Sequence, residues 1–322
     1  MPSPADLLTP SRLLDRRAAF APVLAQALAP EHAVSDWLHP APALAPTPIA
    51  RHRVDARRAA GASVLLVPGL FNDCLGTHAQ PFANARGYAD FADLGLAGMR
   101  CVALPGRGSV AHNGALLAAE MRVEADRPEV QELVLIGYSK GVPDALHALA
   151  VLQASGALPA QRLSLVSVAG AVMGTPLASR FAELYDWLSP AARLLGCSAA
   201  DGPELDDLRP EARALWWQAH ALPPDLACYS VIAQREPPQL PPALRPFGRL
   251  LAEQVGRNDG QLHTRDALLP RGEWLAEVRA DHWGVALDMD AHPNPLVRAG
   301  AVQGPPFPRS ALLRALLAWV LS

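Results

Sequence analysis

The sequence has 322 residues, of which 50% are hydrophobic and 18% charged, and its formal net charge is −3. This composition is typical of a globular chain with a large buried core, and it excludes an intrinsically disordered chain. No cluster of Lys and Arg is interleaved with aromatic residues, which argues against nucleic acid as a partner.

The N-terminal part, residues 1–60, is rich in Pro and Ala and is expected to pack on the core of the following domain. It has two short helical patterns and no strong strand pattern. It also lacks the uninterrupted apolar stretch of a secretory signal. No stretch of the chain reaches the roughly 18 apolar residues of a membrane helix, so the sequence predicts a cytoplasmic protein without a transmembrane segment.

A regular alternation of strands and helices begins at residue 61. Short runs rich in Val, Leu and Ile predict strands at 62–70, 98–106, 132–139, 162–170, 226–234 and 274–280. Most of these runs are apolar on both faces, as strands buried in a parallel sheet are. Helical patterns separate them, the clearest at 139–152. The fold class is therefore α/β, with a mostly parallel sheet flanked by helices in one domain over 61–322.

One interval departs from this rhythm. Residues 171–225 give at least two amphipathic helical patterns with four large aromatic residues, which are Tyr185, Trp187, Trp216 and Trp217. The surplus predicts an inserted helical cap that closes over a site and supplies an apolar wall. The alternative is an ordinary insertion that packs on the core without touching substrate, in which case the loop 286–308 is the next candidate for the wall.

The stretch "LVLIGYSKG" places Ser139 at the corner between a predicted strand and a predicted helix. Strands of a parallel sheet deliver their last residues to the edge where ligands bind. A tight turn there strains the serine backbone and leaves no room for side chains two positions away, which explains Gly137 and Gly141. Ser139 is therefore a candidate nucleophile. The alternative is a serine that only caps the helix between turn glycines.

A serine nucleophile needs a base and an acid that orients the base. His282 follows the last predicted strand and is the candidate base, with His292 as the alternative. Asp259 lies in a loop between the last two predicted strands and is the candidate acid, although an Asp-Gly turn is common without catalytic meaning. Ser139, Asp259 and His282 stand in the order nucleophile, acid, histidine.

Attack on a carbonyl creates an oxyanion that needs hydrogen-bond donors. The backbone N–H groups of Leu70, after the first predicted strand, and of Lys140 are the candidates. The Lys140 side chain is expected to point to solvent, since only its backbone is required.

With these residues the sequence resembles the α/β-hydrolase family, in its bacterial lipase and esterase branch, over residues 61–321. "IGYSKG" matches the nucleophile elbow and "VPGL" the oxyanion loop, while "NDGQL" and "ADHWG" match the acid and histidine loops. The resemblance implies the α/β-hydrolase fold with a helical cap inserted after the sixth strand.

The resemblance also implies a serine hydrolase that cleaves carboxylic esters through an acyl-serine intermediate, with no cofactor and no metal. Its substrate would be a small-molecule or lipid-like acyl ester. A thioesterase or acyltransferase would use the same triad, and a hydrolase-fold protein that binds a ligand without turnover remains the second class. The four cysteines, scattered singly, are expected to be buried free thiols.

Overall fold

In the computed structural model, the described residues are 13–41, 53–73, 76–180, 205–254 and 256–322. They form one parallel sheet of seven strands in the order β1-β7-β6-β5-β4-β2-β3. The strands are β1 (Leu13–Asp15), β2 (Ala62–Val67), β3 (Gly98–Cys101), β4 (Glu132–Tyr138), β5 (Arg162–Val168), β6 (Ala227–Ala233) and β7 (Gly272–Val278). The six predicted strands are all present, and the all-parallel sheet confirms the predicted fold class.

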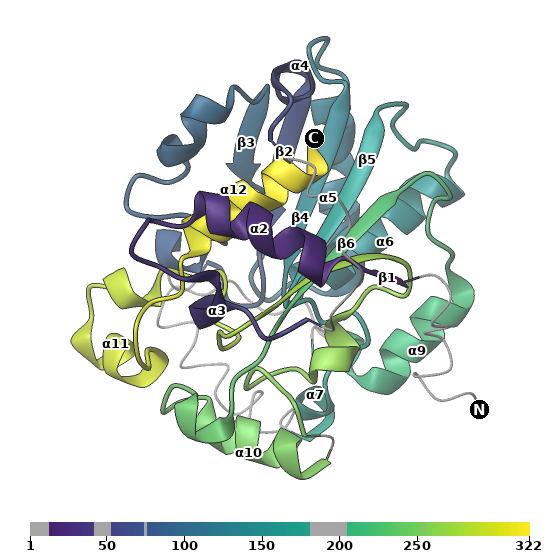
Figure 1. The fold of residues 1–322 in the computed structure, drawn as a ribbon. Coiled ribbons are helices and arrows are strands. Elements are labelled where there is room, and N and C mark those ends of the chain that lie inside the picture. The colour runs from purple at the N-terminus through teal and green to yellow at the C-terminus, as the bar shows by residue number, and fades with distance from the viewer. Residues whose placement is uncertain (1–12, 42–52, 74–75, 181–204, 255) are drawn as a thin grey trace.

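Helices cover both faces of the sheet (Figure 1). The α-helices are α2 (Arg17–Ala27), α3 (Val34–Trp37), α4 (Ala56–Ala60), α5 (Val110–Ala125), α6 (Gly141–Ala154), α7 (Pro176–Arg180), α9 (Pro210–Ala219), α10 (Arg245–Gln254), α11 (Pro295–Ala301) and α12 (Arg309–Val320). In the figure, α2 and α12 cross in front of the sheet and α5 and α6 lie behind it. Short 3₁₀ turns occur between these elements, among them η4 (Asp206–Leu208) and η7 (Met289–Ala291).

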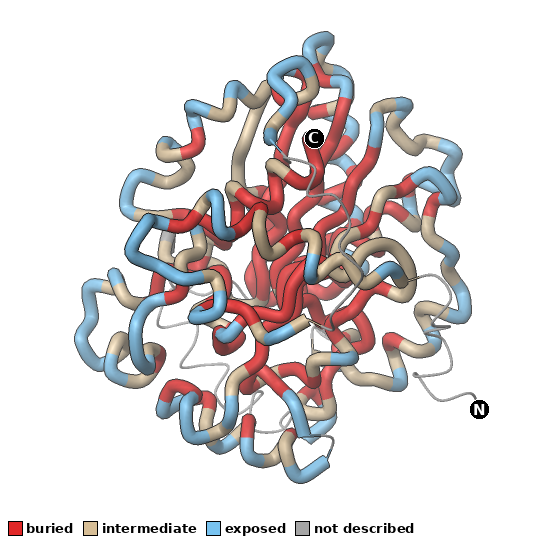
Figure 2. The backbone as a smooth tube through the Cα atoms, in the orientation of Figure 1, coloured by how far each residue is buried: buried red, intermediate tan, exposed pale blue. Residues whose placement is uncertain are grey.

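The hydrophobic core divides into two layers because side chains alternate along each strand. In β2, Val64 and Leu66 belong to the cluster under α2 and α12, whereas Leu65 and Val67 belong to the cluster under α5 and α6. Figure 2 shows the central strands buried throughout and the exposed residues on the outer surfaces of the helices. A strand buried on both faces reads as a continuous apolar run, which is why the sequence pattern located these strands.

The N-terminal segment contributes a strand that the sequence pattern did not indicate. Leu13–Asp15 forms β1 and pairs in parallel with the start of β7, and α2 packs against α12 and β7. Further along, Leu38 makes an antiparallel bridge to Val278. A three-residue strand carries too little alternation to be recognised, and its pairing comes from the neighbouring edge of the sheet.

The insertion at 171–225 follows β5, which is the fifth strand of this chain and not the sixth. Before β2, the described residues contain β1 alone, which makes β5 the fifth strand in this count. Its described parts are α7, η4 and α9, and the residues Tyr185 and Trp187 lie outside the described residues. The cap itself stays a prediction.

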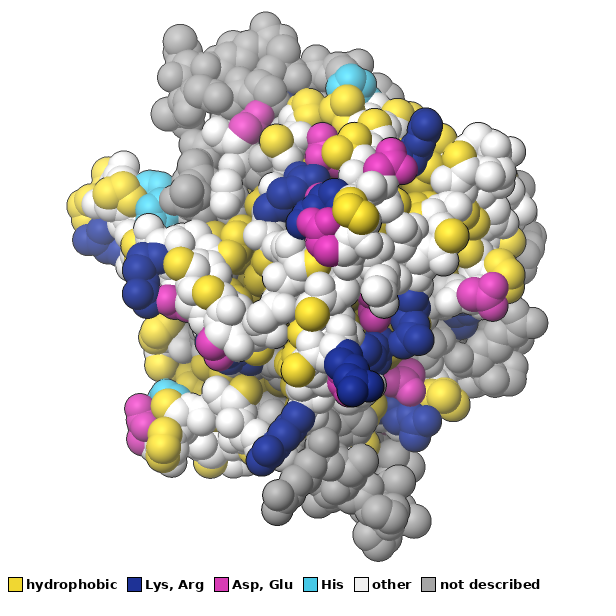
Figure 3. Space-filling view, turned by 90° about the horizontal axis from the view of Figure 1, so that it is seen from above, with side chains coloured by type: hydrophobic (Ala, Val, Ile, Leu, Met, Phe, Trp, Pro, Cys, Tyr) yellow, Lys and Arg dark blue, Asp and Glu magenta, His cyan; other side chains and the backbone are white. Residues whose placement is uncertain are grey.

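Charged side chains of both signs are intermixed on the face seen from above in Figure 3. A carboxylate beneath the surface is that of Glu124 in α5. It accepts a hydrogen bond from Ser63 Oγ at 2.8 Å and pairs with Arg127. Burial opposes ionisation of Glu124, but the hydrogen bonds from Ser63 and Arg127 outweigh it and lower the pKa of this carboxyl group.

Two further findings concern the described residues alone. None of their helices has the length and apolar character needed to cross a bilayer. Cys228 is a buried free thiol and Cys101 a half-buried one, while Cys74 and Cys197 lie outside the described residues.

Candidate active site

Ser139 sits in a sharp turn directly after β4. Its φ of 53° lies in the left-handed region, which costs a non-glycine residue about 1–2 kcal/mol. α6 begins two residues later, at Gly141. The strained turn lifts the serine side chain out of the sheet layer and leaves it half-buried at the carboxyl edge.

The glycines on either side of Ser139 are required by close contacts. A Cβ on Gly141 would lie 2.2 Å from the Val67 carbonyl oxygen, and one on Gly137 would lie 2.9 Å from Val142 Cγ2. The first of these contacts is with backbone, which cannot move aside cheaply. The two glycines therefore allow α6 to start against β2 and β4, as the sequence analysis expects.

The structure brings Ser139, His282 and Asp259 into one hydrogen-bonded row. His282 Nε2 lies 2.8 Å from Ser139 Oγ, and His282 Nδ1 lies 2.7 Å from Asp259 Oδ2. Both His282 and Asp259 are buried. Because a carboxylate only accepts, Nδ1 carries the imidazole proton and Nε2 is left to accept the serine proton.

The loops that carry Asp259 and His282 hold each other in place. Asp259 Oδ1 accepts from the backbone N–H groups of Gln261 and Leu262 at 2.8 and 2.7 Å, and the His282 N–H donates to the Asp259 carbonyl at 2.8 Å. Tyr138 Oη donates to the His282 carbonyl at 2.8 Å. Burial raises the pKa of Tyr138 well above its usual value, so the phenol stays protonated and able to donate.

The alternative residues from the sequence analysis lie elsewhere. The His292 ring contacts the His78 ring at 5.1 Å between centroids, away from the serine. Asp266, another carboxylate in the connection between β6 and β7, lies 3.3 Å from His263 Nδ1. Neither residue joins the row formed by Ser139, His282 and Asp259.

Two backbone donors lie beside Ser139. A Cβ on Gly69 would be 3.1 Å from Ser139 Cβ, so the loop that carries Leu70 passes directly against the serine. Among the described residues, the N–H groups of Leu70 and Lys140 find no hydrogen-bond acceptor. An oxyanion that formed at this serine would require such unpaired donors beside it.

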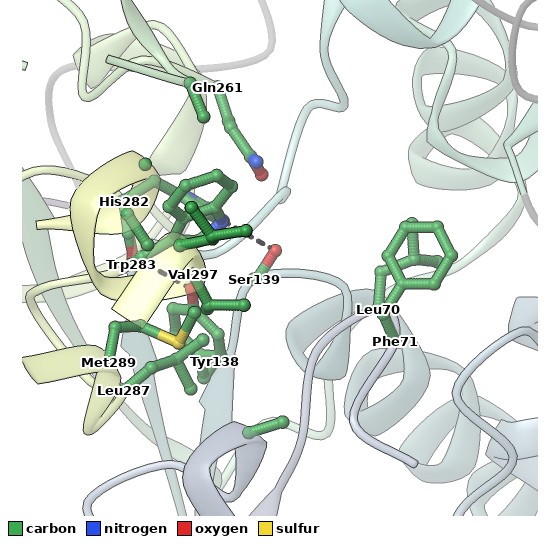
Figure 4. Close-up of a pocket in the computed structure, with 15 residues that line it drawn as sticks. Leu70, Phe71, Tyr138, Ser139, Gln261, His282, Trp283, Leu287, Met289 and Val297 are labelled. Carbon is green, nitrogen blue, oxygen red and sulfur yellow. Dashed lines mark hydrogen bonds between the residues drawn. The ribbon is translucent and has the colours of Figure 1, made fainter. Parts of the chain in front are cut away.

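A pocket of about 430 Å³ opens at Ser139 (Figure 4). In the figure, Leu70 and Phe71 form one side and His282 and Trp283 the other, with Ser139 between them. Its apolar lining includes Leu70, Phe71, Ala79, Ala243, Trp283, Leu287, Met289, Leu296 and Val297. The volume falls in the range of small-molecule sites.

The polar side chain of Gln261 also lines this pocket, and Figure 4 shows its amide directed toward Ser139. The sequence analysis did not identify it. Its position directly after Asp259 and Gly260 could have indicated Gln261 from the sequence. The turn that holds Asp259 also directs the Gln261 side chain into the pocket.

Comparison with solved structures shows what this arrangement resembles. A metagenomic carboxyl esterase superposes with a TM-score of 0.80 at 29% sequence identity, covering 99% of this chain and 96% of that one. The chain has the α/β-hydrolase fold. The propeptide form of the Bacillus licheniformis lipase BlEst2 matches with a TM-score of 0.54 at 20% identity, over 84% of this chain and 55% of that one.

The resemblance to the esterase and lipase branch of the α/β-hydrolases is thereby confirmed. No protein-family model matches the sequence, and no curated protein matches it. The likeness rests on the solved structures, and for the carboxyl esterase it extends over almost the whole length of both chains.

The side chain of Lys140 does not point to solvent, so that expectation was wrong. Lys140 is 1% exposed, and its Nζ donates to both carboxylate oxygens of Asp144 at 2.8 and 2.9 Å. The two residues are one helical turn apart, which brings their side chains together on the inner face of α6. Burial raises the pKa of Asp144, and the nearby ammonium group opposes that rise.

Trp216 and Trp217, the described tryptophans of the insertion, do not line the pocket at Ser139. Trp216 and Trp217 pack against the cluster under α5 and α6. The Trp217 indole N–H donates to the Val172 carbonyl at 3.1 Å, and that of Trp216 to His147 Nδ1 at 3.4 Å. Among the described residues, the segment 286–308 contributes four apolar side chains to the pocket lining, which are Leu287, Met289, Leu296 and Val297.

No group of three His, Cys, Asp or Glu side chains in the described part of the chain is placed to hold a metal ion. The site as described is thus a serine, a histidine and a carboxylate beside backbone donors and an apolar pocket.

Proposed function

We propose that the protein is a serine hydrolase that cleaves carboxylic esters with an apolar acyl or alcohol part through an acyl-serine intermediate. The observation that supports it most is the unbroken row from Ser139 Oγ through the imidazole of His282 to Asp259, at the mouth of an apolar pocket. The likeness to a carboxyl esterase over almost the full length agrees with this chemistry.

In the proposed acylation step, Ser139 Oγ attacks the carbonyl carbon of the ester while His282 Nε2 takes the serine proton. The carbonyl oxygen becomes an oxyanion, which accepts hydrogen bonds from the N–H groups of Leu70 and Lys140. Asp259 holds the imidazole in the required tautomer and stabilises the imidazolium. The bond to the leaving oxygen then breaks as His282 returns its proton to that oxygen, and the alcohol departs.

Deacylation repeats these steps with water. His282 Nε2 removes a proton from water as the hydroxyl oxygen attacks the acyl carbon of the Ser139 ester. The second oxyanion uses the same two N–H groups. When it collapses, the proton moves from His282 to Ser139 Oγ, and the carboxylic acid is released.

The test replaces the nucleophile. Ser139→Ala should fold normally, because this side chain is only half-buried, but should lose turnover of acyl nitrophenyl esters by several orders of magnitude. A fluorophosphonate probe, whose phosphorus is attacked by the serine with loss of fluoride, should label wild type and not this variant. Ser155→Ala, at an exposed serine that ends α6, is the matched control and should label fully.

Retention of both labelling and turnover by Ser139→Ala would overturn the proposal. Measuring the same acyl groups as thioesters separates an esterase from a thioesterase, since both would use this triad. A ligand-binding protein without turnover would show neither ester nor thioester cleavage in the wild type.

A further inference from the structure

The buried ion pair behind the nucleophile is the charged feature that the reaction steps above leave unused. Lys140 and Asp144 are each 1% exposed. Removing two charges from water is costly, and a pair of apolar residues would often give an equally stable fold. The pair therefore calls for an explanation beyond stability.

Asp144 also contacts a residue from another helix. Asn113 of α5 donates from Nδ2 to Asp144 Oδ2 at 3.0 Å and to the Pro105 carbonyl at 3.1 Å. The same amide nitrogen thus ties the carboxylate to the loop that follows β3. That loop is packed closely around Asn113, because a Cβ on Gly108 would lie 2.2 Å from Asn113 Oδ1.

The loop after β3 in turn holds the loop that carries Leu70. The Phe71 N–H donates to the Gly106 carbonyl at 3.0 Å, and Asn72 Nδ2 donates to the Leu104 carbonyl at 3.2 Å. Phe71 has a φ of 62°, so the loop is fixed in a strained conformation that needs such support.

A continuous polar path therefore joins the two proposed oxyanion donors. It runs from the loop of Leu70 through the loop 104–108 to Asn113, then to Asp144 and the side chain of Lys140. One end of the path is the residue after Ser139, and the other end is the segment of Leu70 and Phe71, which lies across the pocket from His282 and Trp283 (Figure 4).

We propose that Asp144 is a positioning residue for catalysis, which fixes the spacing of the Leu70 and Lys140 N–H groups through Lys140 and Asn113. The inference rests on the proposed function. Neither Asp144 nor Asn113 lines the pocket at Ser139, so neither is proposed to contact the substrate. Their effect is on the geometry of the oxyanion hole, where a misplacement of about 1 Å can cost about 10²-fold in rate.

The decisive variant replaces the pair by apolar residues of similar size, Lys140→Met with Asp144→Leu. This change keeps the backbone N–H of Lys140 and removes both charges of the pair, while the buried Arg213 keeps the nearby Asp207 carboxylate, so the variant should unfold near the wild-type temperature. Asn113 then loses its hydrogen bond to the Asp144 carboxylate and keeps only the one to the Pro105 carbonyl. As a result, kcat for a nitrophenyl ester should fall by about 10- to 100-fold while KM stays within about threefold.

Inhibition by a boronic acid separates a positioning role from a contribution to stability alone, because a loss of stability alone would leave the inhibition constant unchanged. Its boron adds to Ser139 Oγ, and the resulting tetrahedral adduct places an oxygen in the oxyanion hole as the reaction does. The inhibition constant of phenylboronic acid should rise in the double variant by about the factor that kcat falls. The single variant Asp144→Asn should show the same pattern together with a lower unfolding temperature.

The matched control is Glu132→Gln, at the start of β4, the strand that ends just before Ser139. Glu132 is also a buried carboxylate, 4% exposed and paired with Arg58, but it lies far along β4 from Ser139. This variant should lose stability and keep kcat. The positioning role is refuted if the double variant keeps kcat within about twofold, or if kcat falls without a matching change in boronic acid inhibition.

Failure of the positioning role is distinguishable from failure of the proposed function. In the first case the wild type still hydrolyses esters and labels at Ser139. In the second, the wild type itself fails to turn over ester or to react with the fluorophosphonate probe.

Discussion

The pocket geometry predicts how the rate should depend on acyl chain length. Each methylene buried against apolar side chains contributes up to about 0.8 kcal/mol, or about fourfold in kcat/KM. A pocket of about 430 Å³ can take several methylenes before it is filled. Three additional buried methylenes would raise kcat/KM by about 60-fold, after which the profile should level off.

Val297→Ala tests which residues form the wall. Val297 lies beside Ser139 in Figure 4, is half-buried, and belongs to α11 within the segment 286–308. The change removes two carbon atoms from the lining, which sets an upper limit of about 1.6 kcal/mol, or about 15-fold, on the loss of long-chain kcat/KM. Acetyl esters, which have no further chain carbons to pack against this side chain, should lose less.

Trp217→Ala is the matched control outside the pocket. Its ring packs under α5 and α6, so this variant should lose stability and keep the ratio of octanoyl to acetyl kcat/KM. The assay is a series of nitrophenyl esters from acetyl to decanoyl on all three proteins. If Trp217→Ala flattens the profile and Val297→Ala leaves it unchanged, the assignment of the acyl wall is wrong.

Two further predictions concern carboxylates. Asp259→Asn should lower kcat by about 10³- to 10⁴-fold, whereas Asp266→Asn should leave it within about twofold, and an equal loss in both would contradict Asp259 as the acid. Glu124 has a lowered pKa in the folded state, so the stability it contributes is present above its usual pKa of 4.5 and is lost as the pH falls through the folded value. Thermal unfolding between about pH 5 and pH 3 should therefore show a shallower loss for Glu124→Gln than for wild type, and parallel losses would contradict this.

The sheet and the nucleophile corner were predictable because their signals are local. Strands β2, β4 and β5 are apolar on both faces, and the glycines around Ser139 report a tight turn. Ser139 directly follows β4 and His282 follows β7, whereas Asp259 comes after α10 in the connection from β6 to β7. Connections that leave the carboxyl ends of parallel strands lie at one edge of the sheet, which brings the three residues together. β1 gave no such signal because three residues are too few.

The environment of Lys140 was not predictable in the same way. A lysine beside a nucleophile is usually solvated, and its spacing from Asp144 indicates an ion pair without saying which face of α6 is buried. The decisive partner, Asn113, comes from a different helix, so only the tertiary packing reveals it. The tryptophans at 216 and 217 illustrate the same limit, since an amphipathic pattern does not say which layer the apolar face covers.

The N-terminal segment has a consequence for solubility. An unpaired strand at the edge of a sheet is a template on which another molecule can add its own strand and aggregate. Here Leu13–Asp15 pairs with the first residues of β7, and Leu38 and His39 bond to its last residues. Both ends of β7 are therefore occupied from within the same chain. By this reasoning the residues before the first core strand protect the protein against self-association, although they lie outside the row of residues proposed for catalysis.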